Sequence, residues 1–417
     1  MKKYNQKERS FLKSIMTLAS GSVLAQVITI LASPLTTRIY SPSELGVFTF
    51  ITTAVNMFGV VINGRIEMAI VTDNDENNVY PLIVISFIID LILSVLVSLG
   101  YLIYFICFKK EYLWTVLFIF SLLFVTGLIN ILNSYNNRYR EYKLMTSVFV
   151  TRTVTQNVLT ILLGLIKNNV FNLLLSQILG LINGLRKQSK VLLANRDKLK
   201  IHINFRNIIK KQRKYLIYSI PASFMNGFSY SSINLFIQNL FGMEMLGFYS
   251  ISYRVLGIPL NIISNNVSRV FIQDATVELN KYGNYKNSFK KNFLFLIIMS
   301  LLLIIGLTFI IPDLCTLFFG ESWAQVGDFI RILAPMFGIR LMVSALASGL
   351  IVSNKQNLEM LLQSLLFIAS LICFFVVSVF KLHILVYLKS INILFSIIYL
   401  LFLFIIYKDS LGNFQKY

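Results

Sequence analysis

The chain has 417 residues, of which 56% are hydrophobic and 13% charged, and its formal net charge is +20. A water-soluble domain is typically about 25% charged, so this composition excludes an ordinary soluble protein. The excess of basic residues could indicate nucleic-acid binding. However, these residues gather at the ends of apolar stretches, which is typical of membrane proteins and argues against a nucleic-acid partner.

Apolar stretches long enough to cross a bilayer recur along the whole chain. About 20 apolar residues in a helix span the hydrocarbon core, and 81–107, 293–311 and 382–407 reach or approach that length. The strict alternation of barrel strands is absent. We therefore predict an all-α integral membrane protein with about twelve transmembrane helices. The predicted spans are 12–33, 45–63, 81–107, 112–133, 146–166, 170–185, 215–240, 246–271, 291–311, 325–351, 357–380 and 382–407.

The distribution of Lys and Arg predicts the orientation. With a cytoplasmic N-terminus, most basic residues fall in cytoplasmic segments, as the positive-inside rule requires. The outer segments then hold only Arg38, Lys109, Lys110, Lys167 and Lys381. We expect both termini to be cytoplasmic.

The most basic stretch lies near the centre and divides the chain into two halves. We expect an N-terminal six-helix lobe at 1–190, a basic cytoplasmic connecting loop at 191–214 and a C-terminal six-helix lobe at 215–417. A short similarity links the halves, because Leu45-Gly46-Val47-Phe48-Thr49 parallels Leu246-Gly247-Phe248-Tyr249-Ser250 at the start of the second helix of each. Paired repeats in one chain are frequent in transporters, with the substrate path between them.

Several features of enzymes are missing from the loops. No Walker A sequence is present, and the longest polar loop is too short for a catalytic domain. Asp73, Asp75 and Glu76 form an acidic group that we interpret as a solvated turn rather than a metal site. The two histidines and three cysteines have no ligand spacing. We therefore expect no catalytic residue, no metal and no cofactor.

Polar residues share one face of several predicted helices. In the eighth, Arg254, Asn261 and Asn265 are separated by seven and four residues, so they fall on the same side. In the second, Asn56 belongs to a similar stripe with Thr52, Gly59 and Asn63, and in the first, Gln26 adds an amide. These faces predict the walls of a polar cavity. Hydrogen bonding between helices is the other interpretation.

The ionisable residues within the predicted spans are mainly cationic. Charges at this depth usually face water or protein. Arg254, Arg331, Arg340 and Lys389 are opposed by Asp90, which is a candidate for ion coupling. Arg331 and Arg340 lie on opposite faces of a straight helix, although a kink at Pro335 could turn both inward. An excess of arginine favours an anionic substrate, because guanidinium binds phosphate in a bidentate fork.

The sequence resembles the Wzx-type polysaccharide flippases. The similar segments are Ala19–Gln26, Ser33–Pro42 with Leu45-Gly46, Arg65–Ile70 with its acidic turn, Phe318–Trp323 and Ile332–Pro335. The resemblance implies a two-lobed fold related to the MATE multidrug exporters. It also implies that Arg38 and Arg65 occupy the positions of arginines found in that family.

The resemblance further implies a location in the bacterial cytoplasmic membrane. The expected substrate is an oligosaccharide linked to undecaprenyl pyrophosphate, moved from the inner to the outer leaflet for O-antigen or capsule assembly. The expected partners are this glycan, membrane lipid, and the polysaccharide polymerase and chain-length proteins. Two alternatives stay open. A drug or small-solute exporter would favour an acidic cavity, and a membrane enzyme of polysaccharide assembly would favour a large outer loop.

Overall fold

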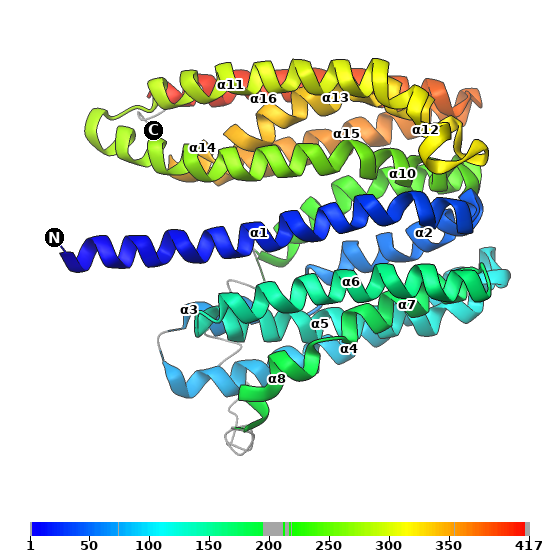
Figure 1. Ribbon diagram of the computed structural model, residues 1–417, viewed down its shortest axis with the longest axis horizontal. Coiled ribbons are helices and arrows are strands. Elements are labelled where there is room, and N and C mark those ends of the chain that lie inside the picture. Colours follow the sequence, from blue (N-terminus) through cyan, green and yellow to red (C-terminus); the bar gives the residue numbers. More distant parts are fainter. Residues whose placement is uncertain are drawn as a thin grey trace. The chain divides into compact units, whose positions relative to one another are not determined.

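The computed structural model describes residues 2–73, 75–194, 212, 217, 219–353 and 355–412 (Figure 1). The described residues contain helices and no strand, which confirms the predicted all-α fold. The α-helices are α1 (Lys2–Ile39), α2 (Pro42–Gly59), α3 (Glu67–Thr72), α4 (Val79–Phe108), α5 (Val116–Arg138), α6 (Tyr142–Ile166), α7 (Val170–Ile182), α8 (Leu185–Ala194), α10 (Ile220–Tyr282), α11 (Lys286–Ile305), α12 (Ile311–Phe319), α13 (Gln325–Leu346), α14 (Gly349–Val352), α15 (Gln356–Phe380) and α16 (Ile384–Ser410).

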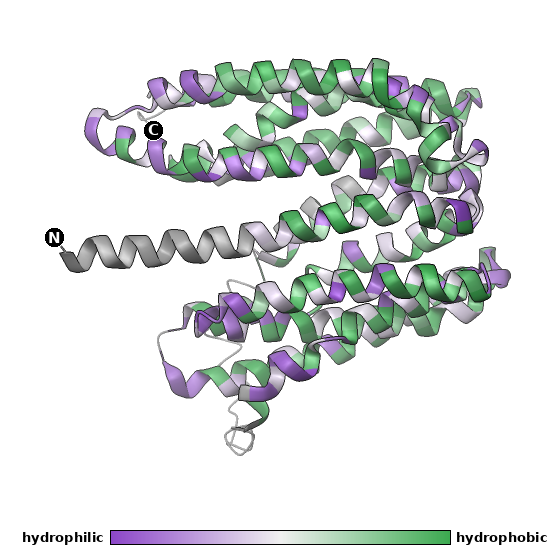
Figure 2. Cartoon of the chain, in the orientation of Figure 1, coloured by the Kyte–Doolittle hydropathy of each residue, from purple (hydrophilic) through white to green (hydrophobic). Residues whose placement is uncertain are grey.

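Nine helical stretches in the described part of the chain are long and apolar enough to cross a membrane. Figure 2 shows hydrophobic colour along the middle of the long helices and hydrophilic colour mostly near their ends. About twelve spans were predicted. The number is lower in the described residues because α10 joins two predicted spans across Gly242. In addition, α2 and α7 are not among the helices that are long and apolar enough. Gly242 interrupts α10 with φ 88° and ψ −178°, a conformation that glycine adopts without a steric penalty.

The contacts divide the chain into two compact units. Unit 1 contains Met1–Tyr40 and Phe50–Gly227, and unit 2 contains Ser41–Thr49 and Phe228–Tyr417. The predicted lobes, 1–190 and 215–417, remain a prediction, and the predicted connecting loop at 191–214 lies largely outside the described residues.

Unit 1 is assembled by close helix packing. Helix α1 runs along α6, α6 packs on α7, and α4 packs on α5. A Cβ atom at Gly21 of α1 would lie 2.2 Å from the Thr146 side chain of α6. Tyr40 Oη donates a hydrogen bond to the Thr160 carbonyl at 3.0 Å. Small residues at such crossings let the helix backbones approach closely. In a bilayer, helices associate through this packing and through hydrogen bonds, because lipid chains are as apolar as the side chains themselves.

Unit 2 is built around α13, which packs on α16, α11 and α12. Its core includes Trp323, whose ring lies 5.7 Å from that of Phe248 in an edge-to-face arrangement. Pro335 lies inside α13. The Met336 N–H donates a hydrogen bond to Asn392 Oδ1 of α16 at 3.0 Å. Helix α16 therefore provides an acceptor for the backbone N–H of the residue that follows the proline.

The repeated Leu-Gly segments meet at one helix crossing in unit 2. Helix α2 begins with a capping box, in which Ser41 and Glu44 exchange hydrogen bonds. A Cβ at Gly46 would lie 1.7 Å from the Met243 carbonyl oxygen, and one at Gly247 would lie 1.9 Å from that of Pro42. Met243 lies four positions before Gly247, and Pro42 lies four positions before Gly46. Each glycine therefore contacts the carbonyl that lies one helical turn before the other glycine. The sequence repeat is matched by a symmetric pair of contacts.

Candidate functional site

The polar face predicted from Arg254, Asn261 and Asn265 lies on α10 in unit 2, in the helical part that follows Gly242. Asn261 and Asn265 are exposed, and Arg254 is half-buried. Helix α10 is continuous from Gly242 to Tyr282, so the spacing seen in the sequence places all three on one side. The large apolar side chains Val255, Ile258 and Ile262 lie between them along the chain.

Arg340 is held against α10 by aromatic side chains. Its Nη1 atom donates a hydrogen bond to Tyr253 Oη at 2.9 Å. Its Cζ atom lies 5.8 Å from the ring centre of Tyr253 and 5.5 Å from that of Phe337. The two rings contact each other edge to face at 5.3 Å, and Tyr249 lies 5.9 Å from Tyr253. These contacts fix the plane of the guanidinium, which is the group best suited to bind phosphate oxygens in pairs.

Arg331, on the same helix, has different partners. Its Nη2 atom lies 3.2 Å from Asp313 Oδ1, and its Nε donates to the Thr308 carbonyl at 3.3 Å. Thr308 lies in a π-helical segment, Gly306–Ile310, which joins α11 to α12. Arg331 and Arg340 therefore have different partners, although Pro335 lies between them. Lys389 is exposed on α16.

Asp90 lies at the centre of a buried polar cluster in unit 1. Ser94 Oγ donates to Asp90 Oδ1 at 3.2 Å, and the carboxylate packs against Gly127 of α5, where a Cβ atom would lie 2.1 Å from Oδ1. Asp90 Oδ2 and Ser86 Oγ are buried, and neither has a hydrogen-bond partner among the described residues. A buried carboxylate in such surroundings is favourable only when it is protonated or paired with a cation.

Two asparagines, Asn63 and Asn130, form hydrogen bonds next to the Asp90 cluster. Asn63 Nδ2 donates to the carbonyls of Gly127 at 3.2 Å and Ser86 at 3.4 Å. Asn130 Nδ2 donates to the carbonyl of Gly59 at 3.0 Å and to Asn63 Oδ1 at 3.2 Å. Helix α2 ends at Gly59, so the expected stripe from Thr52 to Asn63 is interrupted. Asn56 is exposed, whereas Asn63 is buried.

Arg65 lies in the turn that follows α2. Gly64 and Arg65 have positive φ angles of 65° and 58°, and Arg65 Nη1 lies 3.6 Å from Glu67 Oε1. Arg65 Nε and Glu67 Oε2 are buried without a hydrogen-bond partner in the described structure. Glu67 lies outside the long apolar helices, and burial raises its pKa to about 6, although a backbone hydrogen bond and Arg65 lower it.

The other predicted positions in unit 1 are on α1. Gln26 is half-buried, and its Oε1 atom is buried without a hydrogen-bond partner among the described residues. Arg38 is exposed in the last turn. Within the described ranges, no group of three or more His, Cys, Asp or Glu side chains could hold a metal ion.

The partners of Arg340 and of Asp90 were not among the residues predicted from the sequence. The sequence contains one indication of Tyr253. Tyr249 and Tyr253 are one helical turn apart, next to Arg254, so they can be predicted to form an aromatic pair on one face of the helix. The contact between Tyr253 and Arg340 joins residues 87 positions apart, which no local pattern indicates. Gly127, which contacts Asp90, and Asn130, which donates to Asn63, have no distinctive spacing.

The comparison with known proteins agrees with this fold. The profile of a family described as "Polysaccharide biosynthesis protein" matches residues 35–328. The teichuronic acid biosynthesis protein TuaB of Bacillus subtilis is 28% identical over 126 residues, which are 30% of this chain and 26% of that protein. The chain thus matches about a quarter of the length of this relative.

Two solved structures share the fold along nearly the whole chain. A multidrug resistance MATE family transporter of the MOP superfamily, in an inward-facing conformation, has a TM-score of 0.72 at 13% identity and covers 94% of both chains. A MOP superfamily transporter from Pyrococcus furiosus has a TM-score of 0.65 at 14% identity, covering 97% of this chain and 96% of that one.

The fold is therefore that of the MOP-superfamily transporters, and the protein is a multi-pass membrane protein. The chain belongs to the polysaccharide biosynthesis protein family, which confirms the resemblance to polysaccharide flippases.

Proposed function

We propose that this protein is a flippase for undecaprenyl-pyrophosphate-linked oligosaccharide. In this proposal it moves the glycan from the inner to the outer leaflet of the bacterial cytoplasmic membrane, where the glycan enters O-antigen or capsule assembly. The supporting observation is that Arg340 is fixed by Tyr253 and Phe337 inside the apolar helical stretch Glu321–Val352. A charge in such a stretch is costly and usually serves a substrate or a polar path.

The chemistry of unit 2 suits both parts of a glycosyl pyrophosphate. Arg340 and Arg254 are the proposed ligands of the pyrophosphate, because guanidinium pairs with phosphate oxygens. Asn261 and Asn265 offer amide donors and acceptors for sugar hydroxyls. In unit 1, Arg38, Arg65, Gln26 and Asn56 are also proposed as substrate-binding residues. Lys389 and Arg331 add positive charge in unit 2.

Asp90 is proposed to carry the ion that drives transport. Its carboxylate contacts Gly127 so closely that no side-chain atom fits between them, and this packing favours a proton over a hydrated metal cation. Oδ2, which has no hydrogen-bond partner in the described structure, is the atom that would be protonated. The protonated state would remove the cost of a buried charge.

A flipping assay in proteoliposomes tests the proposed function. The purified protein is reconstituted with fluorescent undecaprenyl pyrophosphoryl oligosaccharide, and an impermeant quencher reports the outer leaflet. The wild type should equilibrate the lipid between leaflets. Arg254→Ala and Arg340→Ala should each lower the flipping rate about a hundredfold, since each removes a charge-assisted contact worth about 1.5–3 kcal/mol. Arg254→Lys should keep part of the wild-type rate, because a point charge replaces the guanidinium fork. Lys290→Ala, an exposed cation of α11, is the matched control. Absence of flipping by the wild type would refute the proposal.

A further inference from the structure

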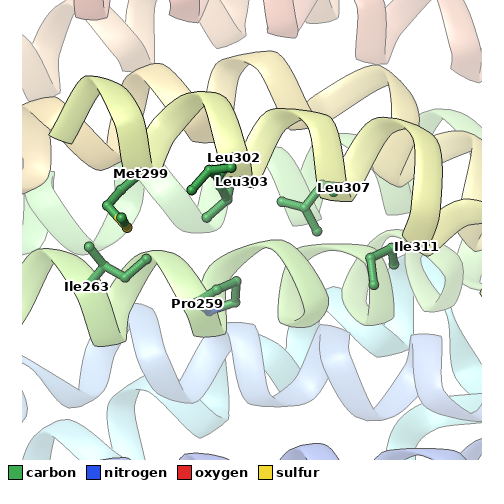
Figure 3. A pocket seen from close by; sticks show the side chains of 8 residues that line it. Pro259, Ile263, Met299, Leu302, Leu303, Leu307 and Ile311 are labelled. Atoms are coloured by element: carbon green, nitrogen blue, oxygen red, sulfur yellow. The ribbon is translucent and has the colours of Figure 1, made fainter. Parts of the chain in front are cut away.

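Unit 2 has an apolar recess between α10 and α11 (Figure 3). Its volume is about 280 Å³, and all the residues that line it are of apolar types. Pro259 and Ile263 of α10 face Met299, Leu303 and Leu307 from α11 and the π-helical segment that follows it.

Two irregularities in the helices create this recess. Pro259 interrupts the hydrogen bonding of α10, and the π-helical segment Gly306–Ile310 widens the end of α11. Gly306 lines the recess, and a Cβ atom there would have no neighbour within 4 Å. The missing side chain therefore leaves open space. Arg331 supports this geometry, because its Nε donates to the Thr308 carbonyl within the π-helical segment.

The recess continues onto the apolar outer surface of α11. Leu302 is 60% exposed, Ile305 is 52% exposed, and Phe309 is 68% exposed. In a membrane protein, exposed apolar side chains of this kind face lipid chains. The lining contains no charged group, so the occupant that fits is a hydrocarbon chain rather than a phosphate or a sugar.

The recess and the proposed headgroup site lie on opposite sides of one helix. Pro259 and Ile263 are each two positions before Asn261 and Asn265. Two residues of α-helix turn by about 200°, so the apolar recess and the polar face of α10 are nearly back to back. One helix could therefore contact both chemical parts of an amphipathic substrate.

We propose that this recess binds the polyisoprenoid tail of the transported glycolipid, an inference that rests on the proposed function. The methyl branches of an isoprenoid need local width, which the proline, the π-helical segment and Gly306 provide. The tail stays in the hydrocarbon core at this site while the headgroup is bound on the other side of α10.

Photolabelling tests this assignment. The full-length protein in nanodiscs is exposed to a diazirine-bearing undecaprenyl phosphate or to phosphatidylglycerol with a diazirine in its acyl chain, and labelled peptides are mapped by mass spectrometry. We expect the isoprenoid probe to label 259–263 and 299–311, and unlabelled undecaprenyl phosphate to compete. Gly306→Leu should fill the recess and lower labelling about tenfold, which corresponds to about 1.4 kcal/mol. Gly100→Leu of α4 is the control, because its Cβ position is also free of neighbours.

Met299→Trp is a second variant that fills the recess from the opposite wall, in case Gly306→Leu does not fold. Equal labelling of the recess by the phosphatidylglycerol probe, without competition by undecaprenyl phosphate, would overturn the assignment. Unchanged labelling in folded Gly306→Leu would also overturn it. If the wild type flips the glycolipid but the recess is not labelled, the inference fails and the proposed function stands. If the wild type does not flip the glycolipid, the proposed function itself fails.

Discussion

Arg340 illustrates how a charged residue is held inside an apolar helix. Insertion of arginine at the centre of a transmembrane helix costs about 2.5–3.5 kcal/mol. Part of that cost is offset by the hydrogen bond to Tyr253 and by the faces of Tyr253 and Phe337, since cation–π contacts contribute about 0.5–2 kcal/mol. The aromatic side chains also orient the guanidinium, so binding an anion requires little reordering.

Tyr253→Phe separates orientation from charge. The variant keeps the aromatic ring beside Arg340 but loses the phenol that accepts the 2.9 Å hydrogen bond. We expect flipping to fall about tenfold, because a hydrogen bond to a charged group contributes about 1.5–3 kcal/mol. Protein yield should be unchanged, and the proteoliposome assay measures the rate. Tyr282→Phe, which removes the phenol of an exposed tyrosine at the end of α10, is the control. A normal rate in Tyr253→Phe would show that the hydrogen bond is unimportant for transport.

Asp90→Asn tests the proposed coupling site. The amide is nearly the same size as the carboxyl group but cannot exchange a proton. Transport driven by a pH gradient should be lost, whereas binding of the glycolipid should persist, because Asp90 is not one of the proposed ligands of the glycolipid. Gradient-driven flipping and fluorescence binding are measured in parallel, with exposed Asp328→Asn as the control. Full gradient-driven transport in Asp90→Asn would rule out this role.

Glu67 should make stability depend on pH. Its folded-state pKa is raised from 4.5 to about 6, so the folded protein holds a proton more tightly than the unfolded chain does. The stabilisation is complete below the unfolded pKa and is lost as pH rises through about 6. Thermal unfolding in detergent should therefore show a decline in Tm over this interval that Glu67→Gln abolishes. An identical pH profile in wild type and Glu67→Gln would contradict the assignment.

At the level of elements, apolar runs bounded by charges were predictable. The predicted span 357–380 is α15 without its first residue, and 81–107 lies within α4. The end of α2 was not predictable. Its polar stripe continues in the sequence, but Asn63 leaves the helix and bonds the carbonyls of Ser86 and Gly127. These partners are distant in the chain, so tertiary contacts overrode the local pattern.

The crossing of α2 and α10 should be intolerant of any side chain at Gly46. A Cβ there would approach the Met243 carbonyl oxygen to 1.7 Å, so the backbones must separate. We expect Gly46→Ala to cost about 1–3 kcal/mol or more, and Gly247→Ala to behave alike because its contact with Pro42 is the counterpart. Gly100→Ala has open space at its Cβ position and should not destabilise. Thermal unfolding compares the three variants, and unchanged stability in Gly46→Ala would show that this crossing is not tightly packed.

For the whole molecule, the distribution of basic residues predicts its orientation in the membrane. In a background lacking Cys107, Cys315 and Cys373, Lys110→Cys should react with an impermeant maleimide in intact cells. Arg140→Cys should react only after permeabilisation, because the inner side is predicted to hold most of the positive charge. Labelling with the opposite sidedness would reverse the assignment of both termini to the cytoplasm.

The sequence predicts an anionic substrate for the proposed site, which stays a prediction, and it indicates only part of the composition of that site. An excess of arginine indicated an anionic substrate, and Arg254, Asn261 and Asn265 do lie along the continuous part of α10. The aromatic support of Arg340, the ion pair of Arg331 with Asp313 and the cluster around Asp90 depend on contacts between helices. Such contacts arise from packing, which hydropathy and helical spacing do not describe.

Depletion of the protein in its host would show whether it moves a lipid-linked glycan to the outer leaflet. Spheroplasts and inverted membrane vesicles are treated with an impermeant reagent that labels the glycan of the undecaprenyl-linked intermediate. We expect the intermediate to accumulate, to become inaccessible in spheroplasts and to stay accessible in inverted vesicles. We also expect wild type, but not Arg340→Ala, to restore outer labelling. Unchanged outer labelling after complete depletion would show that another protein moves the glycan to the outer leaflet.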